Sequence, residues 1–69
     1  MKKKYYVNSN PQVGGEHEVH TETCIFLPSQ ENRTYLGEFE YCEGAVSAAK
    51  RFYYNVDGCF YCASGCHQK

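Results

Sequence analysis

The sequence is 69 residues long, carries a formal net charge of −1 and contains seven tyrosines, four phenylalanines and five cysteines. A chain of this length forms at most one domain, residues 1–69, and such a domain buries only about 60% of the surface that its unfolded form exposes. The near-zero charge excludes a global attraction to nucleic acid or to acidic membranes. A small, tyrosine-rich core typically requires a staple: a metal, a disulfide or an oligomer.

The choice of staple depends on the cellular compartment. The basic start at residues 2–4 is not followed by the apolar run of about 7–15 residues that a signal peptide needs, and no stretch approaches the ~18 apolar residues of a membrane span. We therefore expect a cytoplasmic protein, whose thiols stay reduced. Five cysteines also cannot all pair within one chain. Both points favour a metal over disulfides.

The first third of the chain predicts two strands separated by a loop. Residues 4–8 contain good strand formers, and the lysines that precede them indicate an edge position. Residues 8–16 form a loop, because they contain proline, asparagine and a Gly-Gly pair. Residues 18–21 alternate weakly and predict a second, short strand. In a regular strand, His17 and His20 point to opposite faces and do not ligate one ion.

The most apolar run of the sequence lies at residues 24–28 and ends at Pro28. Proline lacks a backbone N–H, which argues against a central strand. We expect an irregular turn that buries Leu27 together with Ile25 or Phe26.

The second half predicts a strand followed by a helix. Residues 34–41 form the clearest strand, in which Gly37 marks a bulge or a close approach. Residues 42–54 carry apolar side chains at spacings of three and four and predict the single helix, with Phe52 as its main anchor. The predicted fold is a small α+β domain, with a three-stranded antiparallel sheet, one helix and a C-terminal Cys-x-x-Cys turn.

Two groups of residues carry the chemistry. Asp-Gly at 57–58 is a turn signal that leads directly into Cys59-x-x-Cys62, which places two sulfurs on one side of a tight loop. His20-x-x-x-Cys24 can supply the second half of a tetrahedral shell. The result is a site of three cysteines and one histidine, and zinc is preferred because thiolate and imidazole ligands suit it.

Other roles for the same residue types remain open. Cys66 and His67 are possible substitute ligands, because the terminal segment can fold back on the turn. Cys42 is more typical of a buried free thiol than of a ligand. Cys59 and Cys62 can also be plain buried thiols, or a redox pair, although a redox cysteine normally lies at the start of a stabilising helix.

The chain resembles a family of small uncharacterised bacterial proteins over nearly its whole length. This resemblance implies a compact, stand-alone domain and carries no known activity. The residues that carry it are Lys4-Tyr5-Tyr6-Val7-Asn8, Glu18-Val19-His20 with Cys24, Glu31-Asn32-Arg33 with Tyr35-Leu36-Gly37, and Asp57-Gly58-Cys59-x-x-Cys62.

A more distant resemblance is to the zinc-binding domain of the Ada alkylation-repair protein. Cys24, Cys59 and Cys62 match three of its ligand positions. His20 stands where that domain has the cysteine that accepts a methyl group, so methyl-acceptor chemistry does not carry over.

These patterns together predict a function without catalysis. We expect a monomeric binding or adaptor module, held by structural zinc on His20, Cys24, Cys59 and Cys62, with an unknown protein partner. A thiol-dependent redox or sensor protein that uses Cys59 and Cys62 is the first alternative. A nucleic-acid-binding module is the second, and the net charge of −1 speaks against it.

Overall fold

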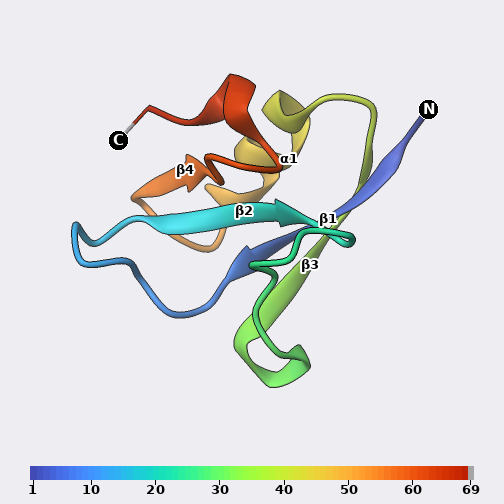
Figure 1. The fold of residues 1–69 in the computed structure, drawn as a ribbon. Coiled ribbons are helices and arrows are strands. Elements are labelled where there is room, and N and C mark those ends of the chain that lie inside the picture. The colour runs from blue at the N-terminus through green and yellow to red at the C-terminus, as the bar shows by residue number, and fades with distance from the viewer. Residues whose placement is uncertain (69) are drawn as a thin grey trace.

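The structure, a computed structural model, describes residues 1–68. Among these residues, none of the helices is both long and apolar enough to cross a membrane. The elements follow one another along the chain as shown in Figure 1: β1 (Lys3–Asn8), β2 (His17–Thr21), the 3-10 turn η1 (Gln30–Asn32), β3 (Arg33–Phe39), α1 (Cys42–Ala49), β4 (Val56–Gly58) and the 3-10 turn η2 (Ser64–Cys66).

Within the described residues, the strands form one four-stranded mixed sheet in the order β3-β1-β2-β4. Strand β1 runs antiparallel to both of its neighbours, whereas β2 and β4 run parallel. The predicted α+β class with one helix is confirmed, but the three-stranded antiparallel sheet is wrong. Strand β4 has only three residues and contains the Asp-Gly pair that the sequence pattern assigned to a turn. In the structure this pair belongs to a strand, because the chain after α1 pairs with β2. Strand β1 is also central, not at an edge.

Strand β3 contains the predicted bulge. Tyr5 pairs with Gly37, but the next residue, Tyr6, pairs with Tyr35, so Leu36 is the additional residue on β3. Gly37 has φ of 120°, a conformation that residues with a Cβ rarely adopt. The expectation for Gly37 is therefore confirmed.

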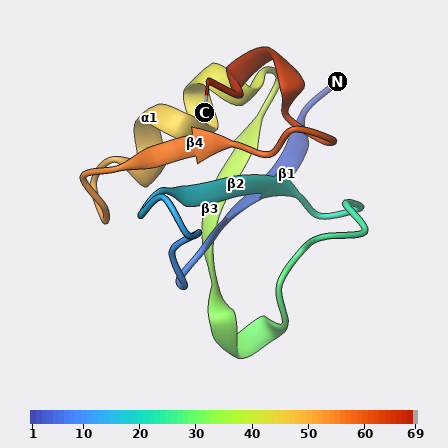
Figure 2. The same ribbon diagram turned by 60° about the vertical axis from the view of Figure 1, so that its left-hand side comes forward.

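Helix α1 covers one face of the sheet, as Figures 1 and 2 show. Because successive side chains on a strand point to opposite faces, the helix-facing side of β1 and β2 carries their buried apolar residues together with His17 and Thr21, and Glu18 and His20 lie on the other, polar side. The buried cluster between helix and sheet consists of Tyr5, Val7, Val19, Ala45 and Ala49. Of the tyrosines in residues 1–68, Tyr5 alone is buried, so the core is less tyrosine-rich than the composition indicated.

The helix is shorter than predicted and is anchored differently. It ends at Ala49 rather than at residue 54, and Phe52 is 57% exposed instead of anchoring it. The N–H groups of Arg51 and Phe52 bond three positions back, to the carbonyls of Ala48 and Ala49, which tightens the last turn before the chain enters β4. Close contact comes instead from the start of the helix, where a Cβ on Gly44 would lie 2.7 Å from Cδ1 of Phe39.

A disulfide joins Cys42, the first residue of α1, to Cys66 in η2. For this pair of cysteines, the preference for a metal over disulfides is therefore wrong. The expectation that Cys42 is a free thiol is wrong as well. The two cysteines are 24 residues apart, and nothing in the local sequence indicates that the segment after β4 folds back onto the start of the helix.

The same segment also makes polar contacts with β4. Buried Asp57 accepts a hydrogen bond from the backbone N–H of Gln68 at 2.8 Å, and its Oδ2 lies 3.1 Å from Nδ1 of His67. The approach is so close that a Cβ on Gly58 would lie 2.7 Å from both the Ala63 carbonyl oxygen and the Cβ of Cys66.

Candidate metal centre

Strand β2 supplies the histidine of the site. Val19 faces the core beneath α1, so the next residue, His20, points to the opposite face of the sheet. His20 is nevertheless only 2% exposed, because two turns of the chain cover it. These turns follow β2 and β4.

The first turn places Cys24 over His20. After β2 ends at Thr21, the N–H of Cys24 donates to the Thr21 carbonyl at 3.2 Å, and the N–H of Leu27 donates to the Cys24 carbonyl at 3.1 Å. The N–H of Phe26 points to Sγ of Cys24 at 3.4 Å. This contact is a charge-assisted hydrogen bond if the sulfur is a thiolate.

The second turn follows β4 and brings Cys59 and Cys62 to the same place. The parallel pairing sets Gly58 opposite Val19, and the N–H of Cys59 donates to the Val19 carbonyl at 3.0 Å. The chain then turns tightly, with the N–H of Ala63 donating to the Cys59 carbonyl at 2.9 Å. Sγ of Cys62 accepts the N–H of Thr21 at 3.3 Å.

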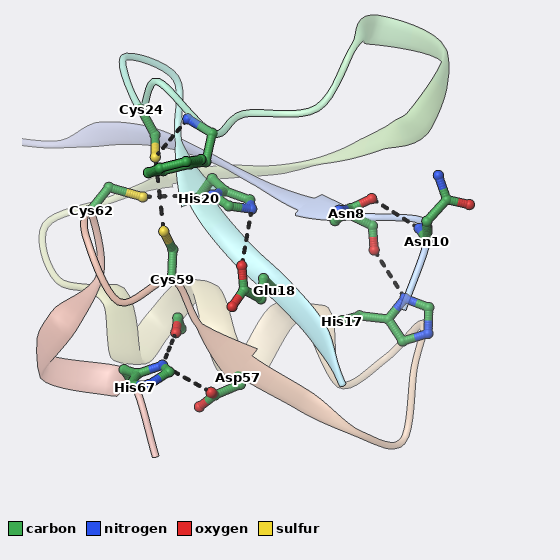
Figure 3. A network of polar contacts seen from close by, with 12 residues as sticks. Asn8, Asn10, His17, Glu18, His20, Cys24, Asp57, Cys59, Cys62 and His67 are labelled. Atoms are coloured by element: carbon green, nitrogen blue, oxygen red, sulfur yellow. Dashed lines mark hydrogen bonds and ion pairs between the residues drawn. The ribbon is translucent and has the colours of Figure 1, made fainter. Parts of the chain in front are cut away.

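The four predicted ligands meet at one point, as Figure 3 shows. One donor atom from each of His20, Cys24, Cys59 and Cys62 lies within 4.8 Å of all the others. Sγ of Cys24 is 3.9 Å from Sγ of Cys59, and Sγ of Cys62 is 3.8 Å from Nδ1 of His20. Ligands on a tetrahedral ion with bonds of about 2.3 Å lie about 3.8 Å apart. This group, called the metal centre below, could therefore hold a metal ion.

Burial sets the protonation of these groups. It lowers the pKa of His20 from its ordinary 6.5, so the imidazole is neutral and its ring nitrogen can act as a ligand at neutral pH. It raises the pKa of the Cys62 thiol to about 12, although the hydrogen bond from Thr21 opposes this shift. A cation at the centre would favour the deprotonated form of Cys62, because it stabilises the thiolate.

Glu18 is a further residue of the site, and the sequence patterns did not single it out. Its Oε1 lies 3.7 Å from Nε2 of His20, on the opposite side of the ring from the cysteines. Metal-bound histidines commonly direct their second ring nitrogen at a carboxylate, which fixes the ring orientation. The signal was present in the sequence, because residues two apart on a strand share a face.

The substitute ligands do not join the metal centre. Cys66 is in the disulfide with Cys42. His67 directs Nδ1 at the Gly58 carbonyl, 3.0 Å away, and at Asp57. Both residues follow the Cys59 turn closely in sequence, but η2 carries them toward the helix side of the sheet.

His17, which the strand pattern separates from His20, is half-buried. Its ring stacks on the ring of Tyr53, with 3.7 Å between the centroids, and its Nδ1 lies 2.9 Å from the Asn8 carbonyl oxygen. It therefore has a structural role at the far end of β2, away from His20, as Figure 3 shows.

Comparison with known proteins gives no match: no family model, no curated protein and no solved structure is significantly similar to this chain.

Proposed function

We propose that this protein is a small binding module in which a structural zinc ion holds the turn after β4 against the sheet. The observation that carries this proposal is the meeting of His20, Cys24, Cys59 and Cys62 donor atoms within 4.8 Å of one another. The two pairs, His20 with Cys24 and Cys59 with Cys62, are separated by 34 intervening residues. Their close approach is therefore a property of the fold and not of local spacing.

The donor set favours zinc. Three sulfurs and one imidazole nitrogen match the ligands that zinc takes in structural sites, and zinc requires neither an open coordination position nor redox chemistry. All four tetrahedral positions are supplied by the protein. A catalytic zinc keeps one position for water or substrate, so a closed set of four supports a structural ion.

The size of the core supports the need for such an ion. The buried apolar cluster contains one tyrosine, two valines and two alanines. Alanine buries little side-chain surface, and a domain of this length is marginal without cross-links, so a metal ion would add stability beyond that of the Cys42–Cys66 disulfide. Zinc binding contributes folding free energy directly, because the unfolded chain has no preformed site.

The thiol-redox alternative is less favoured by the surroundings of Cys59 and Cys62. A redox cysteine needs a lowered pKa, usually from the start of a helix. Here burial raises the pKa of Cys62 to about 12, and the element that follows is the three-residue turn η2. Neither observation provides the positive environment that activates a thiolate.

Metal analysis of untagged protein tests the proposal. We expect about one zinc ion per chain, and we expect the three free thiols to react with a thiol reagent only after chelation. The His20→Asn variant should lose the zinc, whereas His20→Cys should keep it, because a set of four cysteines also binds zinc. Folded, metal-free protein with a rapidly reacting Cys59 would instead support the redox alternative.

A further inference from the structure

Three exposed aromatic side chains gather at the rim of the metal centre. Phe26, Phe60 and Tyr61 are 50%, 59% and 69% exposed. The ring of Tyr61 contacts both of the others, with centroids 4.7 Å from Phe26 and 5.1 Å from Phe60. Phe26 comes from the first turn, and the other two are the intervening residues of Cys59-x-x-Cys62. The two turns that meet at the centre therefore also build this aromatic cluster.

The turn at residues 24–28 was expected to bury Leu27 together with Ile25 or Phe26, but Leu27 is only half-buried and the other two side chains are exposed. Ile25 is 88% exposed and Phe26 half-exposed. The turn directs Cys24 inward to meet the other donors, and the hydrogen bonds of that turn hold the next residues outward. Exposure of such apolar side chains costs solvation free energy, so a clustered set of them marks a binding surface.

The three rings line a pocket of about 320 Å³ on the face of the sheet opposite α1. This volume lies at the lower end of the range for small-ligand sites. Glu18 and His20 line the pocket as well, together with Asn8, Gln12 and Cys59.

The charge of the pocket favours a cation. None of the described residues that line it is a lysine or an arginine, and Glu18 supplies a carboxylate whose side chain is 18% exposed. If the proposed zinc is bound, three thiolates, one neutral imidazole and a divalent ion give the neighbouring centre a net charge of about −1. The negative charge of the metal centre depends on the proposed function, and it has the same sign as the charge of Glu18.

We propose that this pocket binds an alkylated ammonium group, such as the quaternary ammonium of choline or of a trimethylated lysine side chain. Aromatic faces attract such cations through the ring quadrupole, and the alkyl groups are buried favourably against the same rings. A bare metal ion does not suit the pocket, because hard cations prefer several oxygen ligands. A neutral apolar ligand gains nothing from the Glu18 carboxylate, which a cation in the pocket would contact favourably.

Titration of the zinc-loaded, full-length protein with choline tests this proposal, followed by amide chemical shifts in two-dimensional NMR. The control ligand is 3,3-dimethylbutan-1-ol, in which carbon replaces the charged nitrogen at nearly constant shape. We expect saturable shifts at Phe26, Phe60 and Tyr61 with choline, and binding at least tenfold weaker with the neutral alcohol. No shifts with choline, or equal affinity for the two ligands, would overturn the proposal.

Substitutions separate the aromatic and the charge contributions. Phe60→Leu keeps an apolar side chain but removes a ring, and we expect choline binding to weaken about threefold to tenfold. Glu18→Gln should weaken it in the same range, whereas Tyr61→Phe should leave it unchanged. The matched control is Tyr54→Leu, which removes a fully exposed ring outside the pocket. An equal loss in the control would contradict the assignment of the site.

The source of the ammonium group is distinguished by a second arm. A short peptide with one trimethyl-lysine is compared with the same peptide carrying unmodified lysine and with free choline. If the methylated peptide binds more tightly than free choline, the ligand is a modified protein. If the methylated peptide and free choline bind equally, the ligand is a free small molecule. Zinc is measured in every sample, so a folded, zinc-loaded protein that ignores all three ligands refutes the pocket and leaves the proposed zinc module standing.

Discussion

The segment after β4 is attached to the body of the domain at two places, and they differ in kind. At the metal centre, Cys59 and Cys62 meet His20 and Cys24 on the polar face of the sheet. On the other side, Cys66 is bonded to Cys42 at the start of α1. The first attachment was visible in the sequence as two short-range pairs of ligand residues. The second was not, because neither cysteine of the disulfide has a partner nearby in sequence.

The two attachments also stabilise the fold by different mechanisms. A metal ion binds the native arrangement and not the unfolded chain, so its binding free energy is added to stability. A disulfide acts mainly by restricting the unfolded chain. Removing the metal should therefore have a larger effect than breaking the disulfide, and the following experiments test that ranking.

The largest effect is expected for Cys59→Ser. Serine does not replace a thiolate ligand, and a structural zinc site contributes about 10–16 kcal/mol in small zinc-dependent domains. We expect loss of the zinc and loss of the cooperative thermal transition, followed by circular dichroism and metal analysis. Retention of zinc with an unchanged melting temperature would show that this cysteine is not a structural ligand.

The double variant Cys42→Ser, Cys66→Ser should have a smaller effect. Opening a disulfide with a sequence separation of 24 residues lowers the free energy of unfolding by about 3.5 kcal/mol in the chain-entropy model. We expect a folded protein that still binds zinc but unfolds at lower denaturant concentration. Loss of zinc in this variant would show that the two attachments are one cooperative unit.

Gly58→Ala tests the close approach between the attachments. The added Cβ would meet the Ala63 carbonyl oxygen and backbone and side-chain atoms of Cys66 at 2.7–2.9 Å. Backbone atoms cannot move aside as a flexible side chain can, so we expect a loss of about 1–3 kcal/mol, measured by urea denaturation. Gly65→Ala is the control, because its nearest neighbour would be 3.9 Å away. Equal stability of the two variants would contradict this packing.

The last prediction concerns pH and applies to the metal centre alone. Burial raises the pKa of Cys62 to about 12, so zinc must displace a proton from that thiol at neutral pH. Protons compete with zinc as the pH falls, and below about 6.5 they also begin to occupy His20 in the unfolded chain, since its pKa is lowered only in the fold. We expect the zinc affinity to fall at least tenfold for each unit between pH 8 and 6.

A competition assay with a coloured chelator at several pH values measures this slope, and a pH-independent affinity would indicate that the thiols are not the ligands. The disulfide provides the internal control, because disulfide cysteines do not titrate. Stability lost in the Cys42→Ser, Cys66→Ser variant should therefore be similar across the same pH range.

Sequence patterns were sufficient for some of the local features. The bulge at Gly37 was predicted, because glycine weakens a regular strand and is found there mainly at bulges and close approaches. Helix α1 was predicted from its apolar spacing, but its end was placed at residue 54 rather than at Ala49, since Phe52 fits the helical pattern and yet remains exposed. Periodicity identifies an element, whereas the space available in the core decides which members of the pattern are buried.

The amino-acid sequence by itself determined the α+β class, the bulge and the residue types that can bind a soft metal ion. These features depend on local preferences and on side-chain chemistry, which neighbouring residues express without help from distant ones. Only the tertiary structure decided that β4 pairs parallel with β2, that Cys66 meets Cys42 and that Phe26 lies beside Tyr61. Each of these contacts joins segments far apart in the chain, and their formation depends on the packing of the whole domain rather than on any short stretch of it.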